Sequence, residues 1–239
     1  MKTRYVIYTR FNSDHVLSKK YHVALTKEWI KHRMELFNRY TRKCLQLQTN
    51  QDFLNIVHIH PDSKLIVEQE LLNHPPLPKN IIFTSDKITA IENYLQDADQ
   101  LFISNLDSDD LYNPHFVQFL HDYKPKENTS ALICQRGYIF NSQTHIVDKY
   151  FSSSPPFFTQ IYTAEEYLSY AKYYPPLAHG YMRFFNYEAI TEPMYMIVLH
   201  DQNTWPKYKL HVPRCFGNEQ PLSNWKEILK EYDLLPEDN

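Results

Sequence analysis

Short apolar runs alternate with helical patterns through the first 110 residues of the chain. Four runs have the length and the β-branched or aromatic content of buried strands, at residues 5–9, 53–59, 80–84 and 101–106. Between them, apolar positions recur at helical spacing over residues 27–48, 62–72 and 88–95. Alternation of this kind predicts an α/β fold in which a mostly parallel central sheet carries helices on both faces.

The pattern is less regular in the second half. Asn113 followed by Pro114 is typical of a helix start, and Thr163 with Glu166 suits a capping box for a helix to about residue 174. Strands are expected at residues 131–134, 138–140 and 194–199, a loop at 152–156 and a last helix at 225–232. No repeat or linker interrupts the chain, so we expect a single domain over residues 1–239.

Glycine is scarce in this chain. Only Gly137, Gly180 and Gly217 occur among 239 residues, where average usage of roughly 7% would give about seventeen. Loops that wrap phosphates in backbone N–H groups need glycine for close approach. The composition therefore excludes a Walker-type loop and a dinucleotide fingerprint. A phosphate ligand would be bound by side chains or by a metal ion.

Charge and hydropathy exclude further classes. The formal net charge of −3 shows no basic excess, so nucleic acid is not the expected partner. No apolar stretch approaches the ~20 residues of a membrane span, and the N-terminus lacks the apolar core of a signal peptide. We therefore expect a cytoplasmic protein with no transmembrane segment. Cys44, Cys134 and Cys215 are odd in number and lack metal-ligand spacing, which predicts reduced residues of the core.

An acidic run, Asp107-Ser108-Asp109-Asp110, follows the fourth expected strand. Ligands of open α/β sheets bind beyond the carboxyl ends of the strands. Residues two apart in an extended chain point to the same side, so Asp107 and Asp109 are expected to converge. Carboxylates that close repel unless a cation or a proton lies between them, and Mg²⁺ or Mn²⁺ suits such ligands. The alternative interpretation is a solvated acidic turn that caps the next helix.

This arrangement resembles a GT-A fold glycosyltransferase, and the residues around it resemble a rhamnosyltransferase family of bacterial proteins. The matching stretches are spread over nearly the whole chain. They are residues 8–12, the helix positions Trp29, Arg33, Phe37 and Tyr40, and residues 48–53, 106–110, 155–159 and 200–203. The resemblance leaves the identity of the sugar open.

The resemblance implies a metal-dependent glycosyltransferase. Residues 1–112 would bind a nucleotide-sugar donor and residues 113–239 a glycan or related hydroxyl acceptor, with inversion at the sugar. A Mn²⁺ or Mg²⁺ ion would bind at the acidic run. Asp109 is the expected metal ligand, Asp107 would bind ribose or the metal, and Asp110 would ligate directly or hold the site from behind. His200 is the candidate third ligand.

Other residues receive roles from their positions in this scheme. The expected contacts of the donor nucleotide are Thr9, Arg10, Phe11, Asn12, Asp62, Asp86 and Asp107. Asp62 is also a candidate helix cap. Arg33 is a candidate for a buried ion pair beneath the sheet.

The resemblance to inverting GT-A enzymes implies that the catalytic base is a carboxylate near the start of a helix in the second half, which takes the acceptor proton. Glu165 and Glu166 occupy such a place, although Glu166 also suits the capping box, and Asp201 is a rival. His179 and Gly180 precede an aromatic-rich stretch and are candidate contacts of the acceptor.

Two other functions compete with this hypothesis. His58, His60 and Asp62 have a spacing similar to the zinc site of metallo-β-lactamase-like hydrolases, but Ser63 stands where that pattern needs a further histidine. The second alternative is a non-catalytic nucleotide- or carbohydrate-binding protein with a degenerate site. The intact set of Asp107, Asp109 and Asp110 argues against it.

Overall fold

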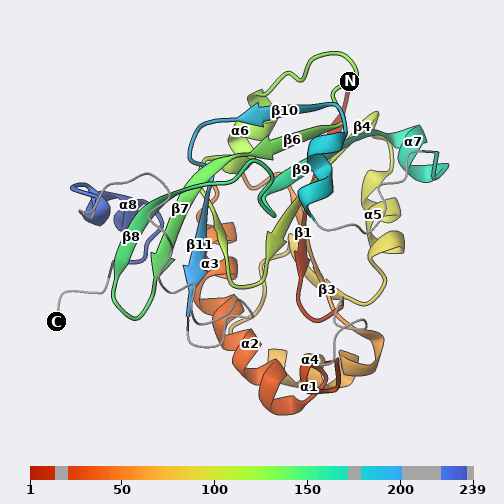
Figure 1. Cartoon of the computed structure of the whole chain (residues 1–239). Coiled ribbons are helices and arrows are strands. Elements are labelled where there is room, and N and C mark those ends of the chain that lie inside the picture. Colours follow the sequence, from red (N-terminus) through yellow and green to blue (C-terminus); the bar gives the residue numbers. More distant parts are fainter. Residues whose placement is uncertain (14–20, 172–178, 201–221, 236–239) are drawn as a thin grey trace.

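A computed structural model gives the arrangement of the chain (Figure 1) and describes residues 1–13, 21–171, 179–200 and 222–235. Its central sheet has seven strands: β1 Thr3–Arg10, β2 Leu54–His58, β3 Ile81–Thr84, β4 Gln100–Asp107, β6 Ala131–Cys134, β9 Phe158–Thr163 and β10 Tyr187–Ile190. Their order is β10-β6-β9-β4-β1-β2-β3. Neighbouring strands pair in parallel except β9, which is antiparallel to β4 and β6. The predicted α/β class with a mostly parallel central sheet is confirmed.

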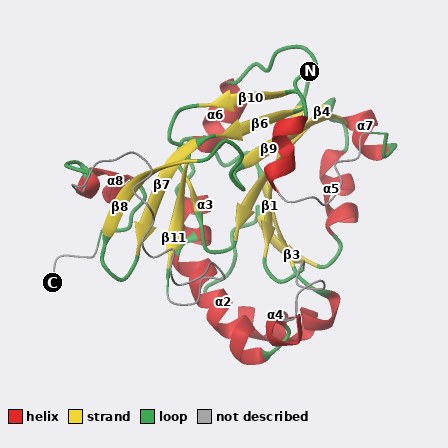
Figure 2. Cartoon of the chain, in the orientation of Figure 1, coloured by secondary structure: helices red, strands yellow, loops and turns green. Residues whose placement is uncertain are grey.

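A second sheet stands beside the first and was not predicted. It contains β5 Leu111–Tyr112, β7 Arg136–Asn141, β8 Ile146–Phe151 and β11 Tyr195–Leu199, in the order β5-β11-β7-β8. Figure 2 shows its longer strands at the left of the central sheet. The expected strands at 138–140 and 194–199 belong here. Because β5 follows the acidic run directly, this sheet anchors the far side of that run.

The helices are α1 Tyr21–Ala24, α2 Lys27–Arg39, α3 Thr41–Gln46, α4 Lys64–Leu71, α5 Lys87–Leu95, α6 Phe116–Asp122, α7 Ala164–Leu168 and α8 Trp225–Glu231, with short 3₁₀ helices η2 Pro61–Ser63 and η3 His179–Phe184. Ile30 and Phe37 of α2 and Phe116 of α6 pack in the core on one face of the central sheet. Ile91 of α5 and Met182 of η3 pack on the other face. Helices therefore cover both faces, as predicted. Among these helices none is long and apolar enough to span a membrane.

Several helix boundaries differ from the sequence expectation. The helix expected over 27–48 is broken at Tyr40, whose φ of −115° and ψ of −73° separate α2 from α3. The helix expected at Pro114 begins at Phe116, because the Asn113 side chain accepts the backbone N–H of His115 in a turn. The capping box of Thr163 and Glu166 is confirmed, although α7 ends at Leu168.

Gly137 has a packing role in the second sheet. A Cβ atom at this position would lie 2.6 Å from the ring and the carbonyl oxygen of Tyr195 on the paired strand β11. The Tyr195 ring in turn stacks on Phe157, with centroids 3.8 Å apart. Because Gly137 has no side chain, the Tyr195 ring fits against β7 and stacks on Phe157 at the end of the 152–157 loop. Gly180 has open space around its Cβ position, and Gly217 lies outside the described residues.

Candidate active site

The carboxyl ends of four parallel strands meet at one edge of the central sheet. Arg10 of β1 is in register with His58 of β2 and with Asp107 of β4, and His58 is in register with Thr84 of β3. Side chains of β1 alternate between the two faces, so Ile7 packs in the α2 core while Val6 packs in the α5 core. By that alternation, Tyr8 and Arg10 project from the α5 face.

Arg10 and Asp107 form an ion pair at this edge. Nη2 of Arg10 lies 2.9 Å from Oδ1 of Asp107, and their side chains are 39% and 32% exposed, so a ligand can reach both. Next to this pair, the Tyr8 hydroxyl lies 2.7 Å from Nδ1 of His58, and the Lys87 ammonium lies 4.7 Å from the centre of the Tyr8 ring. The edge thus presents cationic, anionic and aromatic groups on adjacent strands.

The acidic run is a turn, which corrects the argument from an extended chain. Strand β4 ends at Asp107, and the N–H of Asp110 donates to the carbonyl of Asp107 at 3.2 Å. The Thr41 hydroxyl, from the start of α3, donates to the carbonyl of Asp110 at 3.0 Å. Strand alternation therefore does not align Asp107 with Asp109, and each carboxylate bonds to a different cation.

Asp109 is bound by three donors. The guanidinium of Arg33 donates through Nη1 to Oδ2 at 2.8 Å and through Nη2 to Oδ1 at 3.1 Å, while His200 Nε2 lies 2.9 Å from Oδ2. Arg33 Nε also donates to the Ser108 hydroxyl at 2.8 Å. Burial would raise the pKa of Asp109, but Arg33 and His200 outweigh it, so the pKa lies below its ordinary value.

Asp110 lies behind the turn. Its Oδ1 accepts the backbone N–H of Val198 on β11 at 2.9 Å, and the residue is buried. Burial, followed by the negative charges of Asp109 and Asp107, raises its pKa well above the ordinary value. Asp110 therefore ties the acidic run to the second sheet.

The chain itself relieves part of the repulsion among the three carboxylates of the acidic run. Arg10 pairs with Asp107 and Arg33 with Asp109, and the raised pKa of Asp110 favours its neutral form. The structure therefore supplies chain cations for two of the three carboxylates, and the metal site expected at the acidic run stays a prediction.

His200 and Asp109, the expected metal ligands, bond to each other. Nε2 of His200 and Oδ2 of Asp109 are 2.9 Å apart, an ordinary hydrogen-bond distance, so Nε2 would have to lose its hydrogen before both atoms could bind one ion. The described part of the chain contains no group of three or more His, Cys, Asp or Glu side chains placed to hold a metal ion. Further ligands would have to come from movement of Asp107, from a substrate or from water.

The loop after β1 is largely internal. Thr9, Phe11 and Asn12 are buried, and the Asn12 amide donates to the carbonyl of Ala24 and to the hydroxyl of Ser63. These side chains support the edge from the interior, and Arg10, the last residue of β1, faces outward beside Asp107.

Asp62 and Asp86 follow β2 and β3. Asp62 lies in η2, and α4 begins behind it with Ser63 at the cap position, so the expected helix cap at Asp62 is wrong. Asp86 caps α5 by accepting the N–H of Thr89 at 3.1 Å, and this bond lowers the Asp86 pKa.

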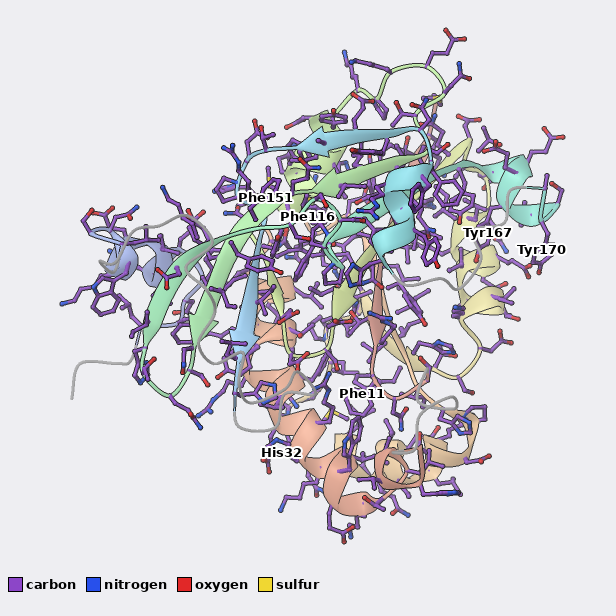
Figure 3. All side chains as sticks on the ribbon, viewed as in Figure 1. Phe11, His32, Phe116, Phe151, Tyr167 and Tyr170 are labelled. Atoms are coloured by element: carbon purple, nitrogen blue, oxygen red, sulfur yellow. The ribbon has the colours of Figure 1, made fainter. Side chains whose placement is uncertain are left out.

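Glu165 and Glu166, the expected catalytic bases, lie at the edge of the sheet opposite Asp107. Because β9 is antiparallel to β4, Thr163 pairs with Gln100 at the start of β4. Gln100 and Asp107 are the two ends of that strand, roughly 23 Å apart at ~3.3 Å per residue. Figure 3 shows the same separation: Tyr167 of α7 lies far from Phe11, which directly follows β1. Asp201 lies outside the described residues.

His179 and Gly180 begin η3, which packs on the α5 face. Nδ1 of His179 lies 2.6 Å from the carbonyl oxygen of Ser154, and the His179 side chain is exposed. The sequence analysis missed Tyr8, Lys87 and the contact between Arg33 and Asp109. The alternation of β1 places Tyr8 on the same face as Arg10 and was the available signal.

The proposed zinc site does not form. Nδ1 of His58 contacts the Tyr8 hydroxyl, whereas Nδ1 of His60 accepts the backbone N–H of Asp62. Among the described residues no group of three or more His, Cys, Asp or Glu side chains could hold a metal ion, so His58, His60 and Asp62 do not gather as the metallo-hydrolase hypothesis requires.

Comparisons with known proteins give structural likenesses at low identity. No family model matches the chain, and no curated protein matches its sequence. Solved structures that resemble it include S. aureus TarS 1-349 in complex with UDP-GlcNAc, with 12% identity, a TM-score of 0.46 and coverage of 85% of this chain and 60% of TarS. The chain thus spans about 60% of that structure's length.

Two further structures illustrate the range of these neighbours. A mannosyltransferase from Pyrobaculum calidifontis, in complex with GDP-Man and Mn²⁺, has 13% identity and a TM-score of 0.38 over 95% of this chain and 68% of its own. A cytidylyltransferase from Leptospira borgpetersenii has 14% identity and a TM-score of 0.41 over 98% and 95%. None of the three reaches a TM-score of 0.5, so the fold assignment rests on strand order and pairing.

Proposed function

We propose that this protein is a glycosyltransferase that moves a sugar from a nucleoside-diphosphate donor to a hydroxyl of a glycan or related acceptor. The observation that supports it most is the exposed pair of Arg10 and Asp107, beside the bound carboxylate of Asp109, at the carboxyl edge of a parallel sheet. Ligands of open α/β sheets bind at this edge. The resemblance of the acidic run to GT-A glycosyltransferases agrees with that position.

The donor would lie across the ends of β1, β2 and β4. The Arg10 guanidinium suits a diphosphate oxygen, because its fork geometry matches phosphate. Asp107 suits a ribose hydroxyl, because an ionised carboxylate accepts the hydrogen bond that a hydroxyl donates. Tyr8 and Lys87 offer an aromatic ring and a charge beside this pair, where the nucleoside would extend. In this way side chains perform the task that glycine-rich loops perform in other nucleotide-binding proteins.

Asp109 and His200 would hold a Mn²⁺ or Mg²⁺ ion, with Asp107 as the nearest further carboxylate of the run. When bound, the ion supplies positive charge to the departing nucleoside diphosphate. Arg33 and Ser108 fix the orientation of the turn, and Asp110 holds it from behind. The resemblance to rhamnosyltransferases places a rhamnose donor in the set to be tested.

The test is release of nucleoside diphosphate from UDP-, GDP- and dTDP-sugars, dTDP-rhamnose included, with Mn²⁺ and with a set of oligosaccharide acceptors. Asp107→Asn should lower turnover by roughly 10²-fold or more, because it weakens both the pair with Arg10 and the contact to the donor. Asp52→Asn is the matched control, since Asp52 is exposed at the opposite edge before β2. Equal turnover of wild type and Asp107→Asn would contradict the proposal, and nucleotide binding without turnover would favour a binding protein.

A further inference from the structure

Ser154 and His179 are joined by two hydrogen bonds. The Ser154 hydroxyl donates to the carbonyl of His179 at 2.7 Å, and Nδ1 of His179 lies 2.6 Å from the carbonyl of Ser154. A carbonyl oxygen only accepts, so Nδ1 carries the hydrogen. In a neutral imidazole the other nitrogen, Nε2, is then the unprotonated acceptor. Ser154 is buried and His179 is exposed, so a fixed backbone holds a ring that borders solvent.

The ring lies at the same edge of the sheet as Asp107. Strand β9 begins at Phe158, and Thr159 pairs with Ser104 near the end of β4, so the preceding loop crosses the carboxyl edge. The Asn105 amide fixes that loop by donating to the carbonyl of Pro156 at 2.7 Å. Asn105 and Asp107 are two apart on β4 and therefore share a face.

The η3 helix, which His179 begins, also packs on the face of the central sheet from which Arg10 projects. Met182 of η3 packs in the core that contains Val6 of β1, which is the α5 face from which Tyr8 and Arg10 project. Figure 1 shows η3 as the light-blue helical turn in front of β6 and β9. His179 begins this turn, so it lies on the acceptor side of the edge, across from the strands that would hold the donor nucleotide.

Three other described carboxylates of the second half, Glu165, Glu166 and Glu192, are less well placed. Glu165 and Glu166 lie at the opposite edge, as shown above. Glu192 follows β10 at the carboxyl edge, but β10 is three strands from β4, about 14 Å away at ~4.8 Å per strand.

We propose that His179 is the catalytic base of the transferase, an inference that rests on the function proposed above. The acceptor hydroxyl oxygen attacks the anomeric carbon of the donor sugar while the bond from that carbon to the diphosphate oxygen breaks. The electron pair of the broken bond leaves with the nucleoside diphosphate. The hydroxyl proton passes to Nε2 of His179, and the imidazolium keeps its Nδ1 hydrogen bond to Ser154 until Nε2 returns the proton to solvent.

The test compares His179→Asn, His179→Ala and Glu192→Gln with wild type in the nucleoside diphosphate release assay. An asparagine amide N–H can replace Nδ1–H in the bond to Ser154, which retains the loop contact but removes the base. We expect His179→Asn to lower kcat by roughly 10²–10⁴-fold with little change in the donor KM, and imidazole to restore part of the activity of His179→Ala. Glu192→Gln should retain wild-type activity.

Calorimetric titration with UDP, GDP and dTDP separates this proposal from the function on which it rests. If wild type binds a nucleotide and turns over a donor while His179→Asn retains full kcat, the base assignment alone is wrong. Loss of activity in Glu192→Gln, with His179→Asn active, would likewise overturn it. If wild type neither binds a nucleotide nor turns over a donor, the glycosyltransferase function itself fails and the base assignment with it.

Discussion

Arg33 binds Asp109 through both terminal guanidinium nitrogens, Nη1 to Oδ2 at 2.8 Å and Nη2 to Oδ1 at 3.1 Å. The two side chains are only 19% and 10% exposed, and Arg33 comes from α2 while Asp109 lies in the turn after β4. A planar fork that meets a carboxylate in this way fixes its orientation as well as its charge. The position of Asp109 is therefore determined by a helix residue that precedes it by 76 residues.

Removing the Arg33 charge should destabilise the fold. Arg33→Met leaves the Asp109 carboxylate buried without its main partner, which typically costs about 3–5 kcal/mol for a buried pair. Lys31→Met is the matched control, because Lys31 is exposed on the same helix and should change stability by less than about 0.5 kcal/mol. Urea unfolding at neutral pH measures both. A loss as small as that of the control would show that the pair does not hold the turn.

The same pair changes the choice of substitution at Asp109. Asp109→Ala leaves the Arg33 guanidinium without its carboxylate. Asp109→Asn retains one oxygen acceptor, so it should unfold at a higher urea concentration than Asp109→Ala. It should still lose Mn²⁺-dependent turnover, because a neutral amide is a poor ligand for a hard cation. Retained Mn²⁺-dependent turnover in Asp109→Asn would remove Asp109 from the metal site.

Gly137 and Gly180 should respond differently to the same change. Gly137→Ala places a methyl group 2.6 Å from the ring and backbone of Tyr195, and such overpacking should cost about 1–3 kcal/mol. Gly180→Ala meets no heavy atom within 4 Å and should be nearly neutral. Thermal unfolding of the two variants compares them directly. Equal melting temperatures would show that β7 and β11 can separate at little cost.

Buried thiols should weaken the protein at alkaline pH. Burial raises the pKa of Cys44 to about 12, whereas an unfolded cysteine ionises near pH 8.5. Between these values the unfolded state holds fewer protons, so its ionisation lowers the free energy of unfolding by up to about 1.4 kcal/mol per pH unit. In Cys44→Ala this decline should be shallower between pH 9 and 11. An unchanged slope in urea unfolding would mean that Cys44 is accessible to hydroxide in the folded state.

The two glutamates of α7 should be dispensable for turnover. Glu165→Gln and Glu166→Gln lie at the edge of the sheet opposite Asp107, so kcat should stay within about twofold of wild type in the nucleoside diphosphate release assay. Glu166→Ala should also lower stability by about 0.5–1 kcal/mol, since it removes half of the capping box. A large drop in kcat for either glutamine variant, with normal stability, would return the base to α7.

The strands that are buried and locally regular were predictable from sequence. Apolar runs in the sequence predicted the bounds of β1, β2, β3 and β4 within a few residues, because a parallel sheet that is covered on both faces needs apolar side chains on both. Strand β9 was missed because its six residues mix Thr and Gln with aromatics and precede a capping box. That omission also placed Glu165 and Glu166 at the wrong edge, since the direction of β9 decides where α7 begins.

The site was predictable where it depends on position along one strand, and not where it depends on contacts between distant segments. Asp107 ends β4 at the edge where Arg10 ends β1, as parallel pairing of the two strands requires. The contact of Arg33 with Asp109 joins residues 76 positions apart, and the contact of His200 with Asp109 joins residues 91 positions apart. Such pairs leave no periodic signal in a single sequence, so the partners of Asp109 emerged only from the folded structure.

The most direct test of the account is calorimetric titration of UDP-, GDP- and dTDP-sugars into the full chain, with and without Mn²⁺, for wild type and for Arg10→Ala. We predict that wild type binds one of these donor classes more tightly with Mn²⁺. Arg10→Ala should weaken that binding by roughly 10-fold or more, because a charge-assisted bond to phosphate contributes about 1.5–3 kcal/mol. If wild type binds none of the nucleotide sugars in either condition, the glycosyltransferase assignment is contradicted.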